Sequence, residues 1–245
     1  MKRILILAAA LFTACTAFAQ SEYNLQRRSL FEVLPVYSSD IVFLGNSITD
    51  GCEWAELFNN RHVKNRGISG DRSGWLLDRL DPIVGGHPKK LFLMIGVNDL
   101  AAGVSPDEIV ANVARLIDRF QSESRWTKIY VQSILPVNGE SFAKFKKHYE
   151  HGRQIVPLNK RLEALCDCLH GDFCRRAEGT ESAVLFESTM RGGMMFGFTG
   201  NYIRVKAPYE RAFINRICRV RLGTMDGTHD LAGEIVRDNG ETERL

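Results

Sequence analysis

Three residues at separate turns could together stabilise the charge that develops when a hydroxyl attacks a carbonyl. Ser47 follows an apolar run within Gly45–Gly51, Gly70 lies in a second glycine-containing turn, and Asn98 follows another apolar run. A serine hydroxyl can act as a nucleophile, while a backbone N–H or a carboxamide can donate to an oxyanion. Each residue alone has an ordinary structural role, as a helix cap, a turn glycine or a strand-end cap. The occurrence of all three residues in this order along the chain favours acyl-transfer chemistry.

The elements that must hold these turns alternate between strands and helices. Three short apolar runs are typical of buried parallel strands: 41–44, 91–95 and 129–135. Because loops that follow the carboxyl ends of parallel strands meet at one edge of a sheet, we expect the three turns to lie side by side. A helix expected to begin near Cys52 would direct free backbone N–H groups towards Ser47.

Helix signals separate the strand candidates. Ser105, Pro106 and Glu108 have the spacing of a capping box, and apolar residues then recur at helical spacing as far as Phe120. A second helix is predicted over 155–166. This alternation predicts an α/β fold with a parallel sheet and helices on both faces.

Length and composition place the chain among ordinary globular proteins. Its 245 residues are 44% hydrophobic and 25% charged, which excludes collagen-like, coiled-coil and wholly disordered chains. The formal net charge of +3 is too small to predict a nucleic-acid or membrane partner by itself. The five cysteines beyond the first twenty residues are odd in number and lack histidines at zinc-like spacing, so we predict neither a disulfide scaffold nor a metal site.

The first residues have the pattern of a signal peptide. Two basic residues precede the apolar run Ile4–Phe12, and Ala17–Ala19 supplies small residues for cleavage after Ala19. The apolar run is too short to span a bilayer. We therefore expect an exported protein, periplasmic or extracellular. Lipidation at Cys15 is a less favoured alternative, because a bulky phenylalanine occupies part of the recognition sequence.

The tail changes character and predicts a small antiparallel β-barrel. From about Ser182 to Val236, short strand-like runs alternate with glycine-containing turns. The expected strands are Ala183–Phe186, Met194–Phe198, Tyr202–Val205, Arg219–Leu222 and Ala232–Val236. A domain boundary is expected near residues 170–180. Residues 204–221 hold five arginines and one lysine against one glutamate, which fits a solvated face and a binding patch equally well.

The three turns resemble the first three sequence blocks of the SGNH (GDSL-type) hydrolases, with Asn46 where that family often has Asp. The resemblance covers about residues 23–166. It implies a flavodoxin-like three-layer α/β/α fold, here without its last strand, and hydrolysis of acyl or acetyl esters of lipids or glycans without a metal or other cofactor. It also implies that Ser47 is the nucleophile. The N–H groups of Ser47 and Gly70 and the side chain of Asn98 would form the oxyanion hole.

That family ends on an Asp-x-x-His block, in which the histidine deprotonates the serine and the aspartate orients the ring. Asp226 and His229 match this spelling near the C-terminus, although Asp-Gly between two strand-like runs is first of all typical of a hairpin turn. Asp167 and His170 match it as well. They continue a helix, however, whose end is expected at the sheet edge opposite Ser47.

Two further histidines, His148 and His151, follow the third predicted strand and are expected near the correct edge. Substrate contact or solvent exposure suits them better than a role as base.

The tail has a resemblance of its own, to the TRAM domain, a small RNA-binding β-barrel that closes the MtaB-type tRNA methylthiotransferases. Three segments within about 178–237 carry it: Val184–Glu187, Gly197–Tyr202 and Leu231–Ile235. The radical-SAM Cys-x3-Cys-x2-Cys cluster of those enzymes is absent from the sequence, so their activity is not implied. The arginine-rich stretch allows RNA contact through phosphates, but an exported esterase has no evident use for it.

The sequence thus predicts a signal peptide over 1–19, an SGNH hydrolase-like domain over 20–170 and a TRAM-like barrel over 178–240. The leading hypothesis is an exported serine esterase that forms an acyl-serine intermediate, impaired if no histidine reaches Ser47. The alternative is a non-catalytic chimeric protein, either a glycan- or lipid-binding remnant or a carrier of an RNA-binding tail.

Overall fold

The structure is a computed structural model that describes residues 21–138 and 145–237. The predicted signal peptide, 1–19, lies outside these residues. The chain divides into two compact units, Met1–Glu163 and Ala164–Leu245. The division falls inside helix α10 (Ile155–Arg175), which begins where predicted and continues beyond residue 166.

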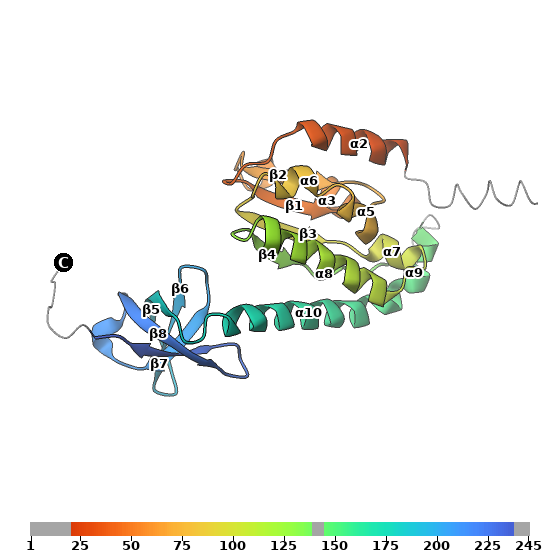
Figure 1. The fold of residues 1–245 in the computed structure, drawn as a ribbon. Coiled ribbons are helices and arrows are strands. Elements are labelled where there is room, and N and C mark those ends of the chain that lie inside the picture. The colour runs from red at the N-terminus through yellow and green to blue at the C-terminus, as the bar shows by residue number, and fades with distance from the viewer. Residues whose placement is uncertain (1–20, 139–144, 238–245) are drawn as a thin grey trace, which may run out of the picture. The chain divides into compact units, whose positions relative to one another are not determined.

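The first unit is built on a sheet of four parallel strands in the order β2-β1-β3-β4 (Figure 1), which confirms the predicted α/β fold with a parallel sheet. The strands are β1 (Ile41–Gly45), β2 (Val63–Gly67), β3 (Lys90–Met94) and β4 (Lys128–Val131). The third apolar run is therefore a strand only up to Val131. β2 was not predicted, because its sequence Val-Lys-Asn-Arg-Gly is mostly polar, as an edge strand can be.

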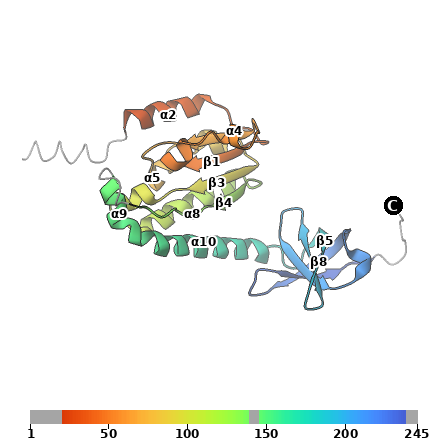
Figure 2. The same cartoon turned by 180° about the vertical axis from the view of Figure 1, so that it is seen from behind.

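Short helices connect the strands, and one long helix, α8, lies along the sheet (Figures 1 and 2). The helices before α10 are α2 (Glu22–Val33), α3 (Ser47–Asp50), α4 (Trp54–Leu57), α5 (Ser73–Leu77), α6 (Asp81–Val84), α7 (Val97–Ala101), α8 (Pro106–Glu123) and α9 (Lys146–His151). The Ser105 hydroxyl accepts the Glu108 N–H at 3.2 Å, which confirms the predicted start of α8.

The two faces of the sheet differ in the side chains they carry. Because successive residues of a strand point to opposite faces, one face of β1 and β3 holds aliphatic residues that are fully buried: Val42, Leu44, Leu91 and Leu93. The other face holds a row of stacked rings. Phe43 stacks on Phe92 with a centroid distance of 4.8 Å, and Phe92 stacks on Tyr130 at the same distance. Trp54 of α4 covers one end of this row, 4.0 Å from the Phe43 ring.

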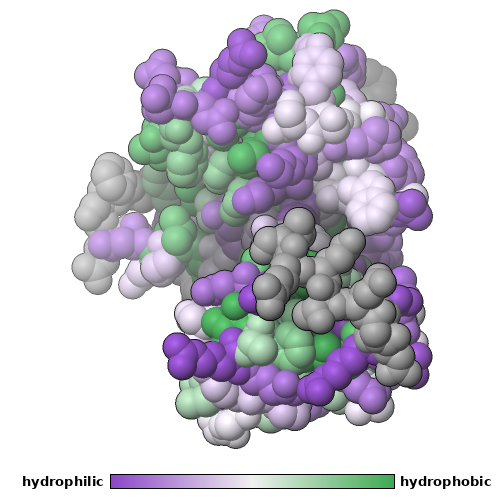
Figure 3. Space-filling view, turned by 90° about the vertical axis from the view of Figure 1, so that its left-hand side faces the viewer, coloured by the Kyte–Doolittle hydropathy of each residue, from purple (hydrophilic) through white to green (hydrophobic). Residues whose placement is uncertain are grey.

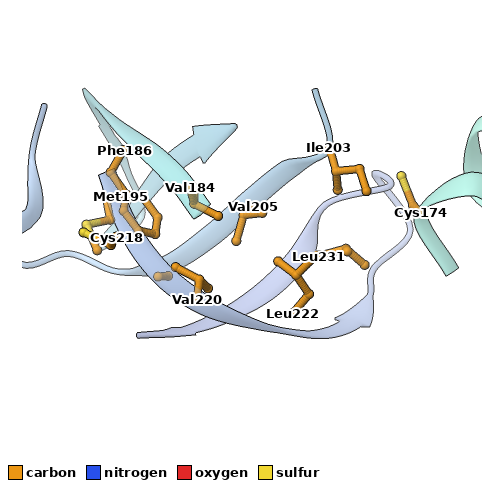
Figure 4. Packing of buried hydrophobic residues seen from close by; sticks show 11 residues of the cluster. Cys174, Val184, Phe186, Met195, Ile203, Val205, Cys218, Val220, Leu222 and Leu231 are labelled. Atoms are coloured by element: carbon orange, nitrogen blue, oxygen red, sulfur yellow. The ribbon is translucent and has the colours of Figure 1, made fainter. Parts of the chain in front are cut away.

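The second unit is a closed barrel with strand order β5-β6-β7-β9-β8. Its strands are β5 (Glu181–Arg191), β6 (Met194–Thr199), β7 (Arg204–Pro208), β8 (Ile217–Met225) and β9 (Leu231–Ile235). One pairing departs from the predicted antiparallel arrangement, because β7 and β9 close the barrel side by side in parallel. Apolar side chains from all five strands, among them Val184, Met195 and Val220, fill the interior (Figure 4).

One face of the molecule has a surface of mixed character. Hydrophilic and hydrophobic residues are interspersed over the face shown in Figure 3, and neither kind covers it alone. Within residues 21–138 and 145–237, no helix combines the length and the apolar character needed to cross a bilayer.

Candidate active site

The carboxyl ends of three neighbouring strands lie level with one another. Gly45, the last residue of β1, pairs with Gly67 at the end of β2 and with Met94 at the end of β3. The turns that follow these ends hold the predicted site residues Ser47, Gly70 and Asn98. The structure therefore brings the three turns to one edge of the sheet, as expected for parallel strands.

Ser47 is exposed and is the first residue of α3. The cap of this helix is Asn46, whose side-chain oxygen accepts the Ile48 N–H at 3.1 Å, so the cap role considered for Ser47 belongs to its neighbour. The helix predicted to begin near Cys52 is α4, which starts at Trp54, and a separate helical turn, α3, begins earlier at Ser47 because Asn46 caps it. Neither the N–H nor the hydroxyl of Ser47 has a hydrogen-bond partner among the residues described.

Close packing against β2 fixes α3. A Cβ atom placed on Gly67 would lie 2.2 Å from the Asp50 nitrogen, so only glycine allows the two backbones to approach this closely. The Asn65 side-chain nitrogen donates to the carbonyl oxygens of Thr49, Asp50 and Cys52, each at 3.0 Å. The segment that begins at Asn65 was expected to be a loop. It starts inside β2 instead, and its Asn65 side chain holds α3, the helix that begins with Ser47.

Gly70 lies in the turn after β2 and adopts a φ of +82°. This left-handed conformation favours glycine, and no atom lies within 4 Å of the position a Cβ would take. The preceding Ser69 N–H donates to the Asp50 carboxylate at 3.1 Å, which ties the turn to α3. In the described part of the chain, nothing accepts the Gly70 N–H, and Gly70 is exposed. Its N–H is therefore free to bind an oxyanion.

Asn98, on α7, is partly buried and faces the same turn. Its side-chain nitrogen donates one hydrogen to the carbonyl oxygen of Asp71 at 2.9 Å. The second hydrogen on this nitrogen finds no acceptor in the described ranges. The next residue, Asp99, is buried and accepts the Ser73 N–H at 2.9 Å and the Ser73 hydroxyl at 2.6 Å. Two adjacent residues of α7 thus hold the segment that carries Gly70.

A buried ion pair stabilises the turn that carries Gly70 from the protein interior. The Asp71 carboxylate lies 2.7 Å from an Arg79 guanidinium nitrogen and also accepts the Asn24 side-chain amide at 3.0 Å. Burial raises the pKa of Asp71 above its usual range, while Arg79 and Asn24 act in the opposite direction. Burial likewise raises the pKa of Asp99, opposed by its hydrogen bonds from Ser73. This buried network leaves Gly70 on the solvent side of the turn.

A histidine for which the sequence favoured substrate contact or solvent exposure contacts one of the predicted site residues directly. Helix α9 packs against α7, and the His148 Nε2 atom lies 3.0 Å from the Asn98 Oδ1 atom. His148 is half-buried rather than solvent-exposed, and burial lowers the pKa of its ring. The two residues are fifty positions apart, so no local spacing in the sequence signals this contact.

Asp226 and His229 belong to the second unit, in the hairpin turn between β8 and β9 that was the alternative interpretation of their spacing. The Asp226 carboxylate accepts the Thr228 N–H at 2.8 Å and the Thr228 hydroxyl at 2.7 Å, and it pairs with Lys206. Lys206 above all, with these hydrogen bonds, lowers the pKa of Asp226. In the described chain no hydrogen bond joins the Asp226 carboxylate to the His229 ring. Asp226 therefore shapes the turn.

The His229 ring lies edge-on to His170, with 5.7 Å between their centroids. His170 is on α10, in the continued helix where the sequence placed it, and its Nε2 atom is 3.7 Å from the Cys174 sulfur. Across residues 21–138 and 145–237, no three His, Cys, Asp or Glu side chains are grouped so that they could hold a metal ion.

Acidic partners neutralise much of the basic stretch on the barrel. Arg204 pairs with Asp230, and Arg219 and Arg221 both pair with Glu181. Two carboxylates thus offset part of the charge of these three arginines, which weakens the case for a phosphate-binding patch.

Comparisons with known proteins agree with the fold and the turns of the first unit. Platelet-activating factor acetylhydrolase IB subunit alpha2 from Gallus gallus is 26% identical over 103 residues, which are 40% of this chain and 44% of that protein. This chain thus spans less than half the length of its curated relative. A solved structure from Streptococcus pneumonia, named after platelet activating factor, is 29% identical, with a TM-score of 0.54 over 66% of this chain and 77% of that one.

A GDSL-like lipase from Bacteroides thetaiotaomicron has the same fold, with 24% identity and a TM-score of 0.50 over 59% of this chain and 73% of that one. The model of the GDSL-like lipase/acylhydrolase family matches residues 43–184. That match covers more than half of the chain and includes all three turns at the sheet edge, and the protein belongs to the GDSL-like lipase/acylhydrolase family.

Proposed function

We propose that this protein hydrolyses carboxylic esters through an acyl-serine intermediate on Ser47. The observation that carries the proposal is the level register of β1, β2 and β3, which places a free hydroxyl, two free N–H groups and a carboxamide at one edge. Family membership supports the same reaction class.

The residues at this edge have distinct roles in the proposed reaction. The Ser47 hydroxyl attacks the ester carbonyl and transfers its proton to a base, and the carbonyl oxygen becomes an oxyanion. The N–H groups of Ser47 and Gly70 and the free hydrogen on the Asn98 nitrogen stabilise that charge. The alcohol then leaves with a proton, and water attacks the acyl-serine by the same route.

The proposed substrates are esters of short acyl groups, acetyl above all, on a small alcohol, a glycan or a lipid. The support is the relative from Gallus gallus, whose name describes acetyl hydrolysis of platelet-activating factor. A panel of p-nitrophenyl esters from acetate to laurate tests the acyl preference. The fastest turnover is expected on acetate, and a maximum at a long chain would refute this part of the proposal.

The reaction also needs a base that accepts the Ser47 proton. His229 is proposed as this base only because Asp226 and His229 match the sequence pattern Asp-x-x-His. Asp226 would not serve as its orienting group, because its carboxylate is bonded to Lys206 and Thr228. If His229 is the base, His229→Ala lowers kcat by about 10²- to 10⁴-fold. A rate unchanged by this substitution would remove His229 from the mechanism.

Hydrolysis of p-nitrophenyl acetate by the full chain tests the central proposal. Ser47→Ala is expected to abolish turnover, whereas Ser122→Ala, on the exposed part of α8, serves as a matched control with unchanged rate. Asn98→Ala is expected to lower kcat by about 10²- to 10³-fold with little change in KM, because an oxyanion donor acts mainly in the transition state. Equal rates for the wild type and Ser47→Ala would refute the proposal that the protein is a serine esterase.

The alternative is a non-catalytic protein that binds a glycan or lipid ester at the same edge, or RNA through a TRAM-like barrel. Equal rates in the Ser47 test would favour this alternative. RNA binding would then appear as salt-dependent retention of single-stranded RNA by the full chain at low salt. Export is proposed on the signal-peptide pattern of 1–19, and sequencing the N-terminus of the mature protein for a start at Gln20 tests it.

A further inference from the structure

We infer that His148 is a positioning residue that fixes the orientation of the Asn98 side chain, so that its nitrogen faces the oxyanion and its oxygen does not. The inference rests on the proposed function, because it assigns a partner to one of the proposed oxyanion donors. The observation that supports it is the 3.0 Å distance between His148 Nε2 and Asn98 Oδ1.

A carboxamide has two ends of similar shape and opposite hydrogen-bonding character, so something must decide which end faces which way. On one side of Asn98 the partner is the Asp71 carbonyl oxygen, 2.9 Å from Nδ2. A carbonyl oxygen only accepts hydrogen bonds, so the end facing it must be the nitrogen. The oxygen of the Asn98 side chain therefore faces His148, and the histidine must donate.

This requirement fixes the tautomer of His148. The hydrogen must be on Nε2, because Nε2 is the atom that contacts Asn98 Oδ1. The other ring nitrogen, Nδ1, is then without hydrogen, and it is buried with no partner among the described residues. Nδ1 therefore has no described partner that would favour the other tautomer, and the contact with Asn98 decides where the hydrogen lies.

The same geometry explains why His148 is not itself assigned as the base. Its Nε2 already donates to Asn98, and its Nδ1 is enclosed, so neither nitrogen is available to accept the Ser47 proton in this arrangement. The ring of Phe145 lies edge-on to His148, with 5.6 Å between centroids, and adds packing that holds the ring in place.

Kinetics with substitutions at both positions test the inference. His148→Leu removes the donor and is expected to lower kcat for p-nitrophenyl acetate at least tenfold with KM changed less than twofold. His148→Gln, whose amide nitrogen can replace Nε2 as donor, is expected to recover most of the rate. In an Asn98→Ala background, His148→Leu is expected to have no further effect, because the role of His148 passes through Asn98. Additive losses would overturn the inference.

A spectroscopic measurement gives a readout that needs no turnover. Long-range ¹H–¹⁵N correlation spectra of the labelled full chain distinguish the two neutral histidine tautomers, and the His148 signals are identified by their loss in His148→Gln. The Nε2–H pattern is expected at pH 8, and the Nδ1–H pattern or an equal mixture would overturn the inference. Failure of the proposed function would appear separately, as equal hydrolysis by the wild type and Ser47→Ala.

Discussion

Replacing Gly67 by alanine should damage catalysis more than its small volume suggests, because every close neighbour of the added methyl group is backbone. The new Cβ would lie 2.2 Å from the Asp50 nitrogen and 2.7 Å from both the Asp50 Cα and the Thr49 carbonyl carbon. Carbon contacts are comfortable at about 3.5 Å, so α3 would have to retreat by roughly 1 Å from β2. Ser47 begins that helix and would move with it.

The expected losses follow from that displacement. Overpacking of this kind costs about 1–3 kcal/mol in the free energy of unfolding. A shift of roughly 1 Å in a catalytic group can cost about 10²-fold in rate. Gly67→Ala is therefore expected to lower kcat for p-nitrophenyl acetate about 100-fold, with a smaller loss of stability.

Hydrolysis kinetics and urea unfolding, measured on the same preparations, check both numbers. Gly74→Ala is the matched control, because its added Cβ meets its nearest neighbour, the Asn112 side chain, at an ordinary 3.8 Å. The control is expected to retain wild-type kcat. Wild-type activity and stability in Gly67→Ala would show that α3 and β2 are not held as the structure describes, and would refute the reasoning.

Three further substitutions probe the same edge. Gly70→Ala meets no steric obstacle but must adopt a φ of +82°, so unfolding in urea should show a loss of about 1–2 kcal/mol. Asp50→Ala removes the acceptor of the Ser69 N–H, and kcat measurements should show a fall of about tenfold as the turn loosens. Burial lowers the pKa of His148, so the folded state takes up its proton less readily than the unfolded state. The wild type should therefore lose stability relative to His148→Gln as the pH falls below the ordinary histidine value of 6.5, a difference that urea unfolding at pH 8 and pH 5 would reveal.

Helices and strands could be predicted from the sequence where the residues that determine them are close together in the chain. Helix α8 was predictable because its cap, its first-turn proline and its apolar stripe all lie within one continuous segment. Strand β2 was not, because polar residues such as Asn65 serve α3 with their side chains while the backbone pairs with β1. Helix α2 also went unpredicted. Its buried residues are the polar Asn24 and the apolar Phe31, and one apolar position cannot give a helical period.

The candidate site was predictable in part for the same reason. Ser47, Gly70 and Asn98 each follow a strand end, and parallel strands bring such ends together by geometry alone. The contact of His148 with Asn98 depends on how α9 packs on α7, which no local pattern records. The helix start at Ser47 depends on one capping residue, Asn46, and the four-residue helix that follows is too short to show a helical period in the sequence.

The stacking of Trp54 on Phe43 has a practical consequence for measuring how the two units unfold. The three tryptophans of the chain, at positions 54, 75 and 126, all belong to the first unit, and the barrel has none. Indole fluorescence therefore reports the melting of the unit that carries the serine, while far-ultraviolet circular dichroism reports both. Two separate transitions by dichroism, only one of them accompanied by an emission change, would identify which unit melts first.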